Sequence, residues 1–143
     1  MNKGKDSRTE HEREREELFC DLFICKRYRE RWKVLLAKKD CRRKLLDKLP
    51  GRQDDVLDIK KVYMNFVNAV HVQELEKTIR ELTGFDSPKC YILDDGEYEL
   101  AEGLARVFCH GWGIELEFVA LIGNNVAIVV RGSWNCSYLL VDK

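Results

Sequence analysis

The sequence predicts an α+β protein, and three observations lead to this class. Residues 10–49 are good helix formers with neither proline nor glycine, and Pro50 and Gly51 then stop the helix. Residues 85–143 alternate short apolar runs with glycine- and asparagine-containing turns, which is typical of strands. The 143 residues, 45% of them hydrophobic, suit one domain or one domain with an arm. We therefore expect a charged amphipathic helical arm over residues 1–50 and a compact α+β domain over residues 51–143.

The N-terminal helix carries an apolar stripe that needs a cover. The stripe residues lie on one face at 3.6 residues per turn, and the main ones are Leu18, Leu22, Tyr28, Trp32 and Leu36. The stripe fails after Leu36, so the helix bends near residues 38–40 or presents two faces to different partners. Unbroken, residues 10–49 would extend about 60 Å. We expect a projecting arm, a dimer seam or a helical hairpin, with the stripe packed on the domain or on a second copy of the chain.

The middle segment is predicted to be helical. Ile59, Val62, Tyr63, Phe66, Val67 and Val70 share a helical face, which favours a helix over the competing strand that the valines of residues 62–72 would suit. A second stripe of Val72, Leu75, Ile79 and Leu82 follows on a different face, and Gly84 ends it. We expect a break near His71.

The C-terminal third predicts a strand, a helix and a three-stranded antiparallel meander. The first strand covers residues 89–93, and Asp94 with Glu97 fits a capping box for a helix over residues 98–110. Strands over residues 114–122, 126–131 and 136–141 follow. The turn at residues 123–125 suits a hairpin, and the apolar run after it predicts a central strand buried on both faces.

The charges are unevenly distributed. Residues 1–50 hold 16 basic and 10 acidic residues, a net of +6, whereas residues 51–143 hold 9 and 15, a net of −6. Within residues 26–48, 11 basic residues face 3 acidic ones, and residues 86–102 carry −5. The predicted basic face consists of Arg27, Arg31, Lys38, Lys39, Arg42, Arg43 and Lys44. It suits phosphate backbones, an acidic protein, the acidic half of this chain or of a second copy, or simply solvent.

Few residues indicate catalysis or metal binding. The six cysteines include no CxxC pair, no glycine-rich phosphate loop occurs, and only three histidines are present. We predict no catalytic residues, metal site or cofactor. We expect that the polar N-terminus is not a secretory signal, and no stretch of about 18 apolar residues exists in the sequence. We expect a cytoplasmic, reducing location and no membrane partner.

One ordering of carboxylates resembles a known enzyme core. Glu99 and Glu102 fall on the predicted helix, Glu115 and Glu117 fall on the following strand, and the next strand ends with Val129, Val130 and Arg131. This order resembles the PD-(D/E)xK nuclease-like fold over about 45 residues, and the resemblance implies a magnesium site. A second metal ligand is missing at the Val129–Arg131 triplet and arginine replaces lysine, so the resemblance implies an inactive relative.

The sequence as a whole favours a small intracellular, non-enzymatic binding or regulatory protein that acts through macromolecular interaction and forms a homo-oligomer. A nucleic-acid-binding protein that uses residues 26–48 is the alternative. The metal-dependent nuclease is the second alternative.

Overall fold

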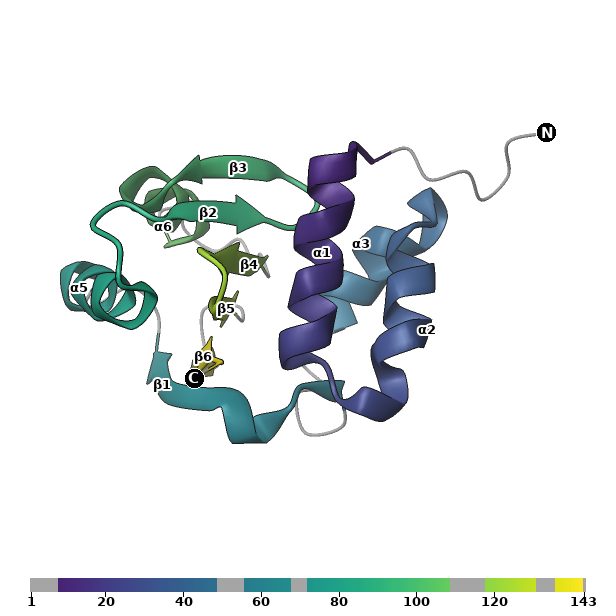
Figure 1. Ribbon diagram of the computed structural model, residues 1–143, viewed down its shortest axis with the longest axis horizontal. Helices are drawn as coiled ribbons and strands as arrows, with labels where there is room; N and C mark the ends of the chain where they lie inside the picture. The colour runs from purple at the N-terminus through teal and green to yellow at the C-terminus, as the bar shows by residue number, and fades with distance from the viewer. Residues whose placement is uncertain (1–7, 49–55, 68–71, 109–117, 131–135, 143) are drawn as a thin grey trace.

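A six-stranded antiparallel sheet forms the centre of the computed structural model, which describes residues 8–48, 56–67, 72–108, 118–130 and 136–142 (Figure 1). The strand order is β1-β6-β5-β4-β2-β3, and all of these pairs are antiparallel. The predicted α+β class is confirmed. No helix in these ranges is long and apolar enough to cross a membrane.

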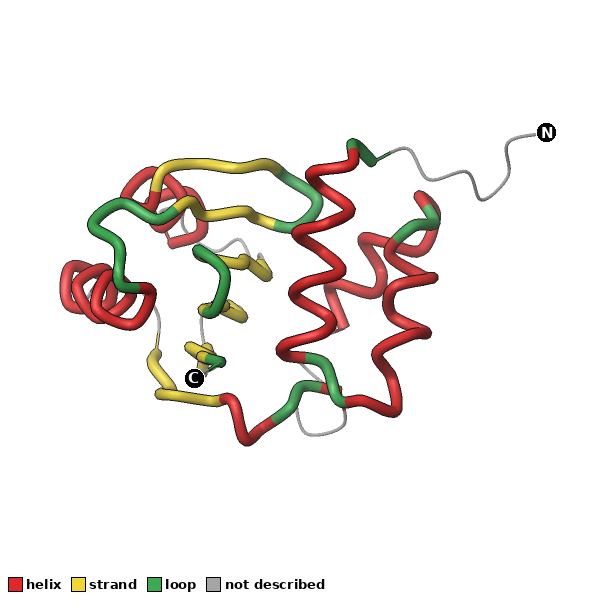
Figure 2. The backbone as a smooth tube through the Cα atoms, in the orientation of Figure 1, coloured by secondary structure: helices red, strands yellow, loops and turns green. Residues whose placement is uncertain are grey.

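Helices cover both faces of the sheet (Figure 2). Along β4 (Phe118–Ile122), Val119 and Leu121 belong to the cluster that the N-terminal helices complete, whereas Ala120 and Ile122 belong to the cluster on the opposite face. Because successive side chains of a strand point to opposite faces, this alternation divides the hydrophobic core into two halves. The central strand β5 (Val126–Val130) is buried along its whole length, as predicted.

Three short helices replace the single N-terminal helix that the sequence suggested: α1 (Glu10–Phe23), α2 (Lys26–Leu36) and α3 (Lys39–Lys48). The break at residues 37–38 lies beside the predicted bend. The break at Ile24 was not predicted, and its cause is distant in sequence, because Leu57 pairs with Ile24 and the Asp58 amide donates to the Phe23 carbonyl. Arg29 donates to the Cys20 and Ile24 carbonyls, which satisfies the end of α1.

The predicted helix is wrong over residues 59–67, and residues 68–70 of that prediction lie outside the described ranges. A single 3-10 turn (Ile59–Lys61) leads into strand β1 (Val62–Val67), which pairs with β6 (Cys136–Val141) at one edge of the sheet. The β-branched and aromatic side chains suit this strand, but its partner lies about 70 residues away along the chain. The following helix α5 (Val72–Thr83) is confirmed, and Gly84 ends it with a positive φ of 78°.

The strand predicted before the last helix becomes a hairpin. Strand β2 (Lys89–Ile92) pairs with β3 (Gly96–Glu99), and helix α6 (Leu100–Phe108) starts only after β3. The predicted capping role of Asp94 and Glu97 is therefore wrong. Asp94 adopts a φ of 66° in the turn, and Glu97 lies in β3, where it pairs with Tyr91 of β2. Aspartate tolerates this left-handed conformation better than most residues. The meander of β4, β5 and β6 is confirmed, although residues 114–117 of its first strand lie outside the described ranges.

Candidate interaction surface

Most of the predicted basic face is exposed. Six of its seven members have exposed side chains, and only Arg42 is half-buried; the exposed six are Arg27, Arg31, Lys38, Lys39, Arg43 and Lys44. Lys26, at the start of α2, is exposed as well. Apart from Arg43, none of these cations forms an ion pair within the described part of the chain.

Helix α2 presents its outer face to solvent. It packs on α1 and α3, and these two helices in turn contact β4 of the sheet (Figure 1). Arg27, Arg31 and Val34 follow i, i+4, i+7 spacing and are all exposed, while Trp32 and Leu36 on the opposite side are buried. The same helix therefore buries an apolar side and exposes a cationic one.

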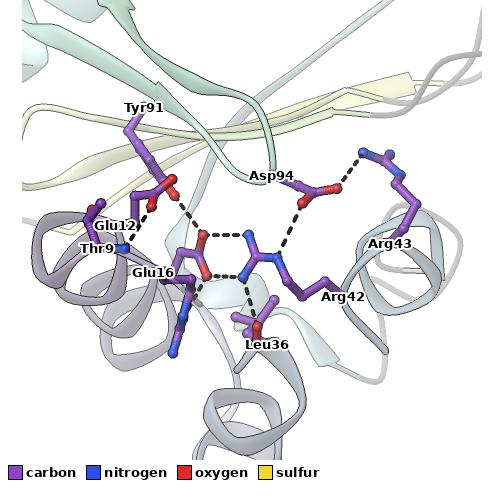
Figure 3. A network of polar contacts seen from close by, with 9 residues as sticks. Thr9, Glu12, Glu16, Leu36, Arg42, Arg43, Tyr91 and Asp94 are labelled. Carbon is purple, nitrogen blue, oxygen red and sulfur yellow. Dashed lines mark hydrogen bonds and ion pairs between the residues drawn. The ribbon is translucent and has the colours of Figure 1, made fainter. Parts of the chain in front are cut away.

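Arg42 is held inside the protein by a buried carboxylate, and Figure 3 shows its contacts. Glu16 of α1 has no exposed surface, and its two oxygens accept from Arg42 Nη1 at 2.6 Å and from Arg42 Nη2 at 2.7 Å. Arg8 Nη1 donates to Glu16 at 2.7 Å and the Tyr91 hydroxyl donates to it at 2.6 Å. Arg42 also donates to the Leu36 carbonyl at 2.7 Å. We call Glu16, Arg8, Arg42 and Tyr91 the Glu16 cluster.

The Glu16 cluster joins α1 and α3 to strand β2. The hydrogen bond to Glu16 is the main reason that the pKa of Arg42 lies above its usual value. Burial, followed by the hydrogen bond to Glu16, raises the pKa of Tyr91 well above its usual value. Both groups therefore keep their protons at any physiological pH and act as fixed hydrogen-bond donors to Glu16.

Within the predicted acidic region, the four carboxylates of the β2–β3 hairpin have partners inside the chain. Asp94 pairs with Arg42 at 3.2 Å and with Arg43 at 3.8 Å (Figure 3). The remaining pairs around the β2–β3 hairpin are Asp95 with Arg106, Glu97 with His11, and Glu99 with Lys89. The basic segment thus meets the acidic half of its own chain at Arg42 and Arg43, whereas the outer cations of α2 have no such contact in the described ranges.

The predicted apolar stripe packs inside the chain. Trp32 and Leu36 are buried in the cluster between the N-terminal helices and the sheet, and Leu18, Leu22 and Tyr28 pack against it. Phe19 and Phe23, which adjoin the stripe, are fully buried, and so is Glu16, which the sequence analysis did not single out. A signal for Glu16 existed, because residues 16, 19, 20 and 23 follow helical spacing and place this carboxylate in line with the buried side chains.

The carboxylates behind the nuclease resemblance are only partly described. Glu99 pairs with Lys89, Glu102 is exposed on α6, and Val129 and Val130 are buried in β5. Glu115, Glu117 and Arg131 lie outside the described residues. In the part of the chain that is described, no group of three histidine, cysteine or acidic residues is placed to hold a metal ion.

Comparison with known proteins yields no family: no family model, curated protein or solved structure matches this chain.

Proposed function

We propose that this protein is a non-enzymatic binding protein that contacts an anionic macromolecule through the basic face of α2 and α3. The observation that carries the proposal is the contrast between two charged regions. The acidic side chains of the β2–β3 hairpin have partners within the chain, whereas the exposed cations Arg27, Arg31, Lys38, Lys39 and Lys44 have no ion pair within the described ranges.

Clustering of like charges has a cost for the free protein. Neighbouring cations repel one another, and their summed field attracts anionic partners and accelerates association. Internal contacts hold α2 in place beneath its exposed cations, since Lys33 pairs with Asp21 at 2.6 Å and Arg29 caps α1. An anionic partner would relieve the repulsion without any rearrangement of α2.

Retention on immobilised heparin tests the proposal, because heparin is a generic polyanion. The triple variant Arg27→Gln, Arg31→Gln, Lys38→Gln removes three exposed cations from the basic face. We expect it to elute at clearly lower salt than the unmodified protein.

A control variant with Arg13→Gln, Lys60→Gln and Lys77→Gln removes three exposed cations from α1, the 3-10 turn and α5. Its net charge changes by the same amount, yet we expect its elution to stay close to that of the unmodified protein. Equal shifts for both triple variants would contradict the proposal.

Self-association and a cytoplasmic location remain part of the proposal as expectations from the sequence. The stripe that motivated an oligomer has a cover within the chain, so an oligomer would use another surface. Light scattering of the purified protein measures its mass directly, and a monomeric mass would remove self-association from the proposal.

A further inference from the structure

We infer that the anionic partner is the phosphate backbone of duplex nucleic acid, and this inference rests on the proposed function. A cationic surface can bind either a nucleic acid or an acidic protein, and the inference selects the nucleic acid. The choice depends on what the surface contains besides its charges.

Most of the exposed side chains described in α2 and α3 are cationic, the acidic Glu30 and Asp40 are exposed among them, and little of this surface is apolar. Its one large exposed apolar side chain in the described ranges is Val34, whereas Ile59, Tyr63, Met64 and Phe85 lie on other elements. Cores of protein–protein interfaces are enriched in aromatic residues and depleted in lysine. Interfaces with nucleic acids are polar and strongly positive. This composition favours a nucleic acid over an acidic protein.

The aromatic side chains of α2 argue for a duplex rather than a single strand. Proteins that bind single strands stack bases on exposed aromatic rings. Tyr28 is half-buried against the core, with the Arg27 guanidinium 5.2 Å from its ring centre, and Trp32 is buried. Neither ring is therefore free to stack a base, while the charges remain available to phosphates.

The length of the cationic face suits several phosphate contacts. The 11 residues of α2 extend about 16 Å, over which a duplex presents about ten phosphate charges. Arg27 and Arg31 lie one turn apart on α2, Lys38 lies in the break after this helix, and Lys39 begins α3. Arginine binds phosphate oxygens with two parallel hydrogen bonds, which suits it to such contacts.

Fluorescence anisotropy with three labelled probes tests the inference: a mixed-sequence 20-base-pair DNA duplex, one of its single strands, and poly-glutamate. Affinities are measured across a salt series. We expect the duplex to bind most tightly and its log affinity to fall linearly with log salt. The triple variant Arg27→Gln, Arg31→Gln, Lys38→Gln should flatten that slope by about 2.7, since each lost phosphate contact contributes about 0.9.

The variant with Arg13→Gln, Lys60→Gln and Lys77→Gln should keep the slope of the unmodified protein, and circular dichroism verifies that both variants are folded. Tighter binding of the single strand or of poly-glutamate would overturn the inference and leave the proposed function standing. A slope of log affinity for the duplex against log salt near zero in the unmodified protein would also overturn the inference, and this measurement needs no variant. Equal heparin retention by the two triple variants would overturn the proposed function itself.

Discussion

Arg42 and Arg43 are neighbours in sequence with very different energetic roles, and replacing each with methionine tests the Glu16 cluster. Arg42 donates two hydrogen bonds to the fully buried Glu16 and one each to Leu36 and Asp94. Methionine keeps the apolar stem, so the Arg42→Met variant removes charge and hydrogen bonds more than packing.

The expected loss of unfolding free energy for Arg42→Met depends on the hydrogen bonds that Glu16 retains. Removing one partner of a buried ion pair costs about 3–5 kcal/mol, because it leaves an uncompensated buried charge. Glu16 still accepts from Arg8 and Tyr91, which places the loss near the lower end, at about 3 kcal/mol. Urea unfolding followed by circular dichroism measures this free energy.

Arg43→Met is the matched control, since it removes the same charge one residue away. The Arg43 side chain is 48% exposed and lies 3.8 Å from Asp94. An exposed pair of this kind contributes about 0–1 kcal/mol. Equal losses for the two variants, or a loss below about 1 kcal/mol for Arg42→Met, would refute the assignment of Glu16 as the buried ionic partner of Arg42.

A double-mutant cycle isolates the interaction between the two side chains. Arg42→Met should lower the free energy of unfolding less in a Glu16→Gln background than in the unmodified protein, because no buried charge then loses its partner. We expect a coupling of about 1–3 kcal/mol. Additive losses would contradict a direct ion pair.

The remaining predictions concern the core and its thiols. Gly103→Ala should lower the free energy of unfolding by about 1–2 kcal/mol, since the new Cβ would lie 2.6 Å from Cys90 Sγ. This overpacking outweighs the gain in helix propensity. An unchanged unfolding midpoint would contradict the close approach. Burial raises the pKa of Cys20 and of Cys90 to about 12, so iodoacetamide at neutral pH should modify the half-buried Cys25 and Cys41 before these two buried thiols, and mass spectrometry of the native protein would show the reverse order if this is wrong. Because the unfolded chain releases these thiol protons near pH 9 and the folded chain retains them to about pH 12, the free energy of unfolding should fall between these values, and replacing both cysteines with alanine should reduce that fall. EDTA should leave the melting temperature unchanged, and a clear drop would reveal a structural metal.

Elements defined by local signals could be predicted from the sequence. The stripe of α5 with its terminal Gly84 and the β4–β5 hairpin with its glycine turn needed no information from distant residues. The exposed cations of α2 were likewise visible as part of the basic segment over residues 26–48. In each case the spacing of neighbouring side chains determines the local structure.

Features that depend on contacts distant in sequence could not be predicted. Strand β1 pairs with β6, and the break after α1 depends on Leu57. The burial of Glu16 depends on Arg42 and Tyr91, which come from a different helix and from the sheet. Helical spacing places Glu16 in line with buried side chains, but that spacing does not reveal the partners that its buried carboxylate needs.

The central claim is that α2 and the start of α3 form the surface that binds an anionic macromolecule. An amide-resolved NMR titration with a heparin hexasaccharide tests this directly, because it locates the contact without any substitution. We expect the largest amide chemical-shift changes in α2 and at Lys38 and Lys39. Changes confined to β1 or α5, with α2 unaffected, would contradict the claim.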